Sequence, residues 1–126
     1  MKKIIYTKDA PEPIGPYNQA TMVGDMLYTS GQIAINPATG KLVSDTIEDE
    51  TKQVMENLNA VLTAADMTFD NVFKTTIFIS DMHNFSKINE VYGAYFSSKT
   101  APARETVEVA NLPLFVNVEI SVIATK

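Results

Sequence analysis

Apolar and polar positions alternate along most of this chain in the way that is typical of β-strands. Short alternating or β-branched runs predict strands within residues 2–7, 18–33, 71–80, 104–110 and 115–125. The Gly24–Asp25 pair lies inside the second run, so that run is expected to fold as a hairpin. Three prolines and a glycine at residues 8–17 indicate an ordered loop between the first two strands.

In two segments the apolar residues instead recur with the period of an amphipathic helix. Asp45 or Thr46 can cap the first helix, and three acidic residues follow where the helix dipole favours negative charge. Its expected apolar face consists of Val54, Leu58, Val61, Leu62 and Ala65. Asp81 can cap the second helix. Its expected apolar stripe consists of Phe85, Ile88, Tyr92, Tyr95 and Phe96.

The resulting order of elements is β-β-β-α-β-α-β-β. Two amphipathic helices that each have one apolar face predict an α+β fold, in which both helices pack on one face of a mixed sheet. The chain has 126 residues and shows no repeat or linker, so we expect a single domain over residues 1–126. The other face of the sheet is left uncovered by this arrangement.

The last strand indicates what covers that second face. Its core-facing positions are expected to be Val116, Val118, Ile120 and Val122. The opposite positions are Phe115, Asn117, Glu119, Ser121 and Ile123. This second set is apolar at its ends and polar in the middle, which is typical of a contact surface that contains a polar pocket. Association of subunits is the simplest way to cover it.

Arg104 begins the preceding strand and shares a face with Thr106. If the last two strands form a tight antiparallel hairpin, Arg104 lies opposite Glu119 and Thr106 lies opposite Asn117. This register is conditional, because a slip of one residue moves every side chain to the other face. An Arg–Glu pair across two strands has a purely structural interpretation as an ion pair and a functional one as a polar pocket. The pattern alone leaves both open.

Composition narrows the possible classes of protein. The absence of cysteine excludes thiol catalysis and disulfides, and the single histidine disfavours a metal site. A net charge of −5 without a basic cluster disfavours a nucleic-acid partner. No segment has the length of a membrane span, and the N-terminal apolar run is too short for a signal peptide. The expected location is therefore cytoplasmic.

Four motifs resemble those of the RidA (YjgF) family of imine deaminases. They are "IGPYNQA" (14–20), "YTSGQIAINPATG" (28–40), "INEVYGAYF" (88–96) and "PARETVEVANLP" (102–113). The resemblance implies a chorismate-mutase-like α+β fold, a homotrimer with sites between subunits, and no cofactor or metal. It also implies hydrolysis of small 2-imino acids, such as 2-iminobutanoate and 2-iminopropanoate, to 2-keto acids and ammonia.

The resemblance also implies roles for individual residues. Arg104 corresponds to the arginine that binds the substrate carboxylate, and Glu119 corresponds to the glutamate near the attacking water. The other matching positions are Tyr17, Ser30, Gly31 and Asn89. Each also has a structural interpretation. Tyr17 would anchor the proline-rich loop, Ser30 and Gly31 would mark the end of a strand, and Asn89 would be a solvated helical residue.

Two positions depart from the family pattern. Thr106 stands where many members have cysteine, so only a hydroxyl or backbone contact to the substrate is possible there. Glu105 stands where a small residue is common, and alternation points it away from the pocket. Alternative functions are a trimeric binding protein or regulator for small 2-keto acids and, less favoured by the acidic charge, a ribonuclease. Chorismate mutase chemistry would require more than one cation in the cleft.

Overall fold

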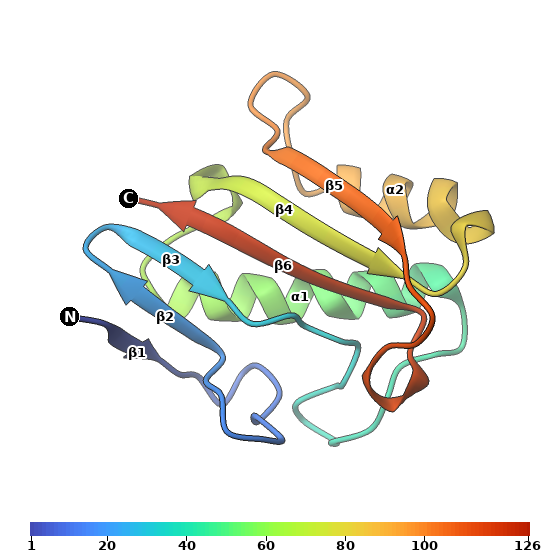
Figure 1. Cartoon of the computed structure of the whole chain (residues 1–126), viewed down its shortest axis with the longest axis horizontal. Coiled ribbons are helices and arrows are strands. Elements are labelled where there is room, and N and C mark those ends of the chain that lie inside the picture. The colour runs from blue at the N-terminus through green and yellow to red at the C-terminus, as the bar shows by residue number, and fades with distance from the viewer.

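The structure is a computed structural model that describes residues 1–126. It contains six strands and two α-helices, which alternate in the order expected from the sequence (Figure 1). The strands are β1 (Lys3–Ile5), β2 (Ala20–Val23), β3 (Met26–Thr29), β4 (Val72–Ile79), β5 (Ala103–Glu108) and β6 (Val118–Thr125). The helices are α1 (Ile47–Ala64) and α2 (Phe85–Gly93).

All six strands form one mixed sheet in the order β1-β2-β3-β6-β4-β5. Every neighbouring pair is antiparallel except β4 and β5, which are parallel. Both helices lie behind the sheet in Figure 1, so they cover one face, and the predicted α+β class is confirmed.

The predicted hairpin of the last two strands is wrong. β6 lies between β3 and β4, and β5 is the edge strand beyond β4. The reason is α2, which follows β4 and carries the chain back to the end of the sheet where β4 began. A strand that follows such a crossover helix runs parallel to the strand before it. β4 therefore separates β5 from β6.

Helix α1 supplies most of the helical side of the core. Thr46 caps it, because its hydroxyl accepts a hydrogen bond from the backbone N–H of Asp49 at 3.0 Å. The side chains of Val54, Leu58, Val61 and Leu62 are completely buried against the sheet. The predicted apolar face of this helix is confirmed.

Helix α2 is shorter than its apolar stripe suggested. Asp81 caps a 3₁₀ turn over Met82–Asn84, and α2 then ends at Gly93. Tyr95 and Phe96 lie beyond the helix, although both still pack against the core together with Phe69.

The last strand also begins later than predicted. Val118, Ile120 and Val122 face the helices and are buried, as expected. Val116 belongs to a separate small cluster with Ile33 and Leu112. Phe115 does not belong to a strand face, because it ends the 3₁₀ turn Pro113–Phe115, has a positive φ of 54° and is 82% exposed.

The face of the sheet away from the helices has no element of this chain over it. Alternation places Ile4, Val23, Tyr28 and Val107 on that face, and their exposed fractions lie between 43% and 52%. Lys74 and Glu105 form an ion pair at 3.0 Å near its β5 edge. Neither helix combines the length and the apolar run that crossing a bilayer requires.

Candidate functional site

The register of the sheet places Arg104 and Glu119 on opposite faces. Arg104 pairs with Thr75 of β4, whereas Glu119 pairs with Phe78 of the same strand. Side chains that are an odd number of residues apart on a strand point to opposite faces. Arg104 therefore faces the helices and Glu119 faces the uncovered side. The expected Arg104–Glu119 pair within one chain is wrong, because it depended on the hairpin that does not form.

Arg104 is held against α2. Its Nη1 donates a hydrogen bond to Oδ1 of Asn89 at 2.6 Å. Its guanidinium carbon lies 5.1 Å from the ring centre of Tyr92 and 5.6 Å from that of Phe85, within the range of cation–π attraction. No carboxylate lies within ion-pair distance. The positive charge of Arg104 is thus orientated but not neutralised by the chain.

The surroundings of Arg104 are partly dry. Burial raises the pKa of Tyr92, whose hydroxyl donates to Oγ1 of the buried Thr75 at 3.1 Å. Thr106 is two residues further along β5 on the same face. Its hydroxyl oxygen is buried and has no hydrogen-bond partner. A buried hydroxyl without a partner is unfavourable, so a polar group from outside the chain would stabilise this position.

A second group of predicted residues meets on the other side of the sheet. Tyr17, Gly31 and Glu119 line one cleft of about 50 Å³. Its remaining walls come from the proline-rich loop, the segment after β3 and the loop before β6. These wall residues include Pro11, Glu12, Ile14, Ile33, Ile35 and Pro113.

Gly31 lies in close contact with the side chain of Glu119. A Cβ atom at position 31 would lie 2.7 Å from Cδ of Glu119, so a side chain there would have to displace the Glu119 carboxylate. The Gly31 N–H also donates to no group of the chain, so it remains available as a donor. Glycine thus lets the backbone approach the carboxylate closely.

Glu119 has the electrostatic surroundings of a potential base. Burial raises the pKa of its carboxyl above the ordinary value. Its oxygens have no hydrogen-bond partner and no cation within the chain. A half-buried carboxylate of this kind is more basic than a solvated one, so it can accept a proton from a bound water.

The hydroxyl groups of Tyr17 and Ser30 already form hydrogen bonds within the chain. The hydroxyl of Tyr17 accepts a hydrogen bond from the N–H of Ile14 at 3.3 Å, which folds the proline-rich loop onto itself. Ser30 donates its hydroxyl to the carbonyl of Asn18 at 2.5 Å and its N–H to the carbonyl of Gln19 at 2.9 Å. Tyr17 lines the Glu119 cleft, whereas Ser30 lies in a neighbouring hollow that Tyr17 also lines. Asn89 and Thr106 lie on the Arg104 side of the sheet.

Sequence reasoning missed the buried polar side chains that hold the walls of this cleft. Gln19 bonds the backbone of Thr7, Ala10 and Pro11. Asn57 donates to the carbonyls of Ile33 at 3.0 Å and Ile35 at 2.9 Å. The position of Asn57 in the sequence could have revealed its burial, because it falls between Val54, Leu58 and Val61 on the buried stripe of α1.

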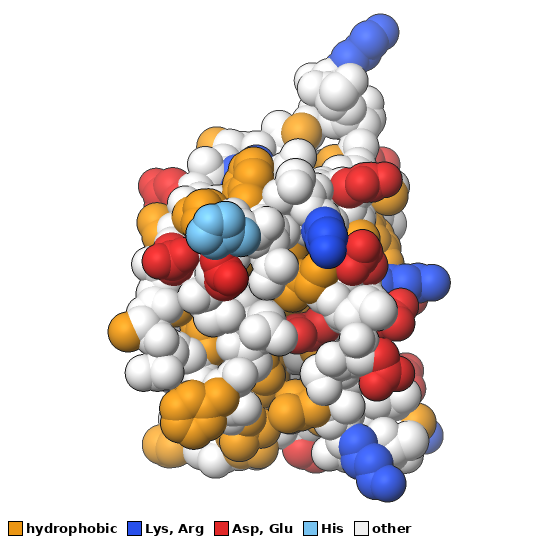
Figure 2. All heavy atoms as spheres, turned by 90° about the vertical axis from the view of Figure 1, so that its right-hand side faces the viewer, with side chains coloured by type: hydrophobic (Ala, Val, Ile, Leu, Met, Phe, Trp, Pro, Cys, Tyr) orange, Lys and Arg blue, Asp and Glu red, His pale blue; other side chains and the backbone are white.

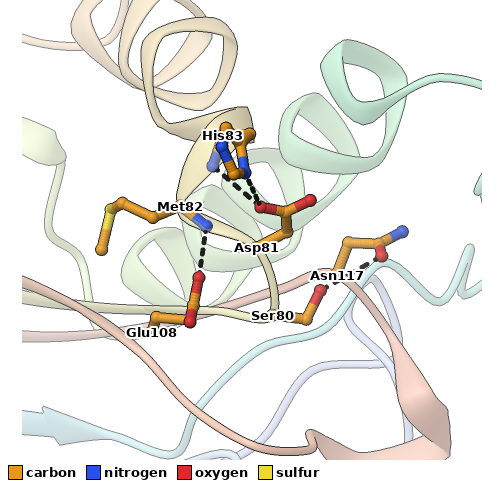
Figure 3. Close-up of polar contacts among 6 residues, drawn as sticks. All are labelled: Ser80, Asp81, Met82, His83, Glu108 and Asn117. Atoms are coloured by element: carbon orange, nitrogen blue, oxygen red, sulfur yellow. Dashed lines mark hydrogen bonds and ion pairs between the residues drawn. The ribbon is translucent and has the colours of Figure 1, made fainter.

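A further polar cluster lies where β4 and β5 end and β6 begins (Figure 3). The Asp81 carboxylate accepts bonds from the backbone N–H and the ring nitrogen of His83, which hold the pKa of Asp81 below its ordinary value. The backbone N–H of Met82 donates to Glu108 at 2.7 Å. The chain has no group of three or more potential metal-ligating side chains close enough to hold an ion.

The surface at this end of the molecule carries no continuous basic region. Figure 2 shows the histidine next to acidic side chains, separate cationic side chains elsewhere on this face, and apolar side chains gathered in the lower part of the view. The exposed apolar residues of the chain include Leu114 and Phe115, which belong to the loop before β6.

Comparison with known proteins identifies the family. The model of the family described as Endoribonuclease L-PSP matches residues 7–126. The mouse protein named 2-iminobutanoate/2-iminopropanoate deaminase is 43% identical, with all of this chain and 93% of the relative covered.

Two solved structures are similar over nearly their whole lengths. A Rid family protein of unknown function from Yersinia pestis is 51% identical with a TM-score of 0.96, and both chains are covered completely. Escherichia coli TdcF with bound serine is 41% identical with a TM-score of 0.92, and 98% of each chain is covered. The resemblance seen in the sequence is thereby confirmed, and the chain belongs to the Endoribonuclease L-PSP family, also called YjgF/RidA.

Proposed function

We propose that this protein hydrolyses small 2-imino acids, such as 2-iminobutanoate and 2-iminopropanoate, to 2-keto acids and ammonia. Membership of a family that includes a named deaminase supports this reaction class. The observation that carries the proposal is the guanidinium of Arg104, which is orientated by Asn89 and two aromatic rings but lacks an acidic partner. A planar guanidinium can grip a carboxylate with two parallel hydrogen bonds.

The proposed site requires two copies of the chain. Within one chain Arg104 and Glu119 lie on opposite faces of the sheet, and β4 stands between their strands. In an assembly, the β5 edge and α2 of one subunit would meet the Glu119 face of the next subunit. We propose a homotrimer, in which the half-apolar uncovered face is buried between subunits. Each cleft would then contain Arg104, Asn89 and Thr106 from one subunit and Tyr17, Ser30, Gly31 and Glu119 from its neighbour.

The proposed mechanism is one addition followed by one elimination. Arg104 holds the substrate carboxylate, and Glu119 takes a proton from a water whose oxygen attacks the imine carbon. The imine nitrogen gains a proton, which gives a tetrahedral carbinolamine. Transfer of the hydroxyl proton to the amine then releases ammonia and leaves the 2-keto acid. We propose that the free N–H of Gly31 orientates the substrate and that proximity supplies much of the acceleration.

The test is the decay of a freshly generated imine. An amino-acid oxidase produces the imino acid, and semicarbazide traps whatever has not been hydrolysed. We expect this protein to lower the yield of trapped imine in proportion to its concentration. A trapped yield equal to that of the buffer control, across several amino acids, would contradict the deaminase function.

A binding or regulatory function is the second candidate. The structure of the relative TdcF contains bound serine, a small molecule that also carries a carboxylate. A protein of this kind would bind 2-keto acids saturably and leave imine decay unchanged. Ribonuclease activity, which the family description names, is disfavoured by the net charge of −5.

A further inference from the structure

Glu50 is a buried acid for which the proposed reaction has no use. It belongs to the first turn of α1, and only 1% of its surface is exposed. No lysine, arginine or histidine lies within ion-pair distance of it. Burying a carboxylate without a cation is unfavourable unless hydrogen bonds compensate. Its contacts therefore indicate what the residue does.

All three donors to Glu50 come from the beginning of β6. Its Oε2 accepts from the backbone N–H of Asn117 at 2.7 Å and from that of Val118 at 3.2 Å. Its Oε1 accepts from the side-chain amide of Asn117 at 2.8 Å. These two residues immediately precede Glu119. The carboxylate thus ties the strand that carries the proposed base to helix α1.

Asn117 continues the connection to β4. The hydroxyl of Ser80 donates to Oδ1 of Asn117 at 3.3 Å, and the N–H of Ser80 donates to the Asn117 carbonyl at 3.1 Å (Figure 3). The loop before Asn117 contains two consecutive residues, Leu114 and Phe115, with positive φ. Because this loop takes a conformation that side chains disfavour, the first residues of β6 need a firm attachment.

The Glu119 side chain packs closely against Gly31. A Cβ atom at residue 31 would lie only 2.7 Å from the carboxyl carbon of Glu119, so the carboxylate lies directly over the Gly31 backbone. We infer that Glu50 is a positioning residue that fixes the start of β6 and thereby holds the Glu119 carboxylate at Gly31. The inference rests on the proposed role of Glu119 in imine hydrolysis.

The first test removes the carboxylate. In Glu50→Ala we expect kcat for imine hydrolysis to fall about ten- to hundredfold, because a small displacement of a catalytic group is sufficient for such a loss. KM should change less than about threefold, since Arg104 still binds the substrate carboxylate. Glu48→Ala is the matched control, because Glu48 is an exposed glutamate of the same helical turn. It should retain the wild-type kcat.

The second test exchanges the two partners. Asn117→Asp alone places two carboxylates against each other, and its kcat should fall. When Glu50→Gln is combined with Asn117→Asp, the new amide oxygen at position 50 still accepts from both backbone N–H groups. The amide nitrogen at position 50 then donates to the new carboxylate at position 117, which also remains an acceptor for the Ser80 hydroxyl. The net charge of this double variant equals that of the wild type.

We expect the double variant to recover most of the kcat that Asn117→Asp loses. Glu50→Gln alone should be milder than Asn117→Asp, because the Asn117 side chain can rotate its amide toward the new partner.

A third measurement is independent of turnover. In protein labelled with ¹³C-glutamate, the carboxyl resonance of Glu119 is assigned with Glu119→Gln and titrated. Burial raises the pKa of Glu119 in the wild type, and this pKa should fall toward the ordinary value in Glu50→Ala as the carboxylate moves into water. If the wild-type protein hydrolyses no imine, the proposed function fails, and this titration still tests Glu50.

Two results would overturn the inference. One is a folded Glu50→Ala protein with wild-type kcat and an unchanged Glu119 titration, which would make Glu50 only a stabilising residue. The other is a double variant that is no more active than Asn117→Asp alone.

Discussion

The guanidinium of Arg104 rests against two aromatic rings and one amide oxygen, none of which is an acid. An arginine has five N–H donors in a fixed plane, and only one of them is used here in a hydrogen bond with the chain. The residue is therefore held in place by weak contacts that leave its charge and most of its donors available. In a structural ion pair, an acidic partner would neutralise the charge and use several of the donors.

Replacement of Arg104 tests this distinction. Arg104→Lys keeps the charge but loses the planar fork, so binding of a 2-keto acid should weaken roughly ten- to hundredfold, or about 1.5–3 kcal/mol. Arg104→Ala should weaken it at least as much. Titration calorimetry with the keto acid and thermal melting of both variants are the measurements.

Stability should change much less than binding in these variants. Cation–π contacts at exposed sites are each worth only about 0.5–1 kcal/mol. If both variants melt early while their folded fractions bind and turn over normally, Arg104 is structural. Lys87→Ala, on the exposed side of α2, serves as the control for loss of one positive charge.

Glu119 gives a prediction about pH. Its pKa is raised by burial, so the folded protein holds this proton to a higher pH than the unfolded chain does. Between the two pKa values the folded state binds more protons, and its stability falls as pH rises through that interval. The Glu119→Gln variant has no carboxyl at this position, so it does not lose stability in this way.

The variant Glu119→Gln should therefore melt higher than the wild type at about pH 7 and nearly equal to it at about pH 4, where the wild-type carboxyl is protonated. Its imine turnover should be strongly reduced. Thermal melts at both pH values and the trapping assay check the two parts. A variant that melts lower at neutral pH would show that the Glu119 charge stabilises the fold.

At the scale of elements, the proline-rich loop depends on a single side chain. Gln19 is 2% exposed, and its amide oxygen accepts from the N–H of Thr7 at 2.7 Å. Its amide nitrogen donates to the carbonyls of Thr7, Ala10 and Pro11. The loop that carries Glu12 and Tyr17 is thus fixed from inside the core.

Gln19→Ala should release this loop. Leaving buried backbone groups without partners costs about 1–3 kcal/mol each, although water can enter here and reduce the loss. We expect faster amide hydrogen exchange at Thr7 and a lower melting temperature. Asn18→Ala is the matched control, because its side chain makes no hydrogen bond. Equal exchange at Thr7 in the two variants would contradict the role of Gln19.

Periodicity predicted the elements well because it reports burial. Both helices, the Gly24–Asp25 hairpin and the buried positions of β6 follow directly from where apolar side chains recur. Periodicity does not report which strand lies beside which. The neighbour of β5 was therefore assigned wrongly, although the α2 crossover in the predicted order of elements favoured a parallel pairing.

The candidate site, like the fold, could be predicted only in part from the sequence. Family motifs supplied the candidate residues, and the structure shows Gly31 close to Glu119 and Asn89 close to Arg104. The supports Gln19, Glu50 and Asn57 were missed because single buried polar residues interrupt an apolar stripe without forming a motif. Only the backbone partners of their side chains, which lie from 8 to 68 residues away in sequence, explain them.

At the scale of the whole molecule, the two halves of the proposed site can be inactivated separately. Arg104→Ala chains retain Glu119, and Glu119→Gln chains retain Arg104, so each homo-oligomer should be nearly inactive. After the two are unfolded and refolded together, neighbouring subunits can supply one intact half each. Random mixing should give about one quarter of the sites both intact residues.

The measurement is imine turnover of the refolded mixture relative to wild type refolded in the same way. Sedimentation equilibrium of each preparation should give the mass of a trimer. Activity of the mixture no greater than the average of the two variants would contradict a site shared between subunits, as would a monomer mass in an active wild-type preparation.

The separation of Arg104 and Glu119 across the sheet also bears on how activity should depend on protein concentration. If each chain holds only half of a site, the number of working sites follows the association equilibrium and not simply the number of folded chains. Specific activity should fall on dilution below the dissociation range, and a 2-keto acid that bridges two subunits should oppose that fall. Expression level would then control the capacity for imine hydrolysis more steeply than in proportion to the amount of protein.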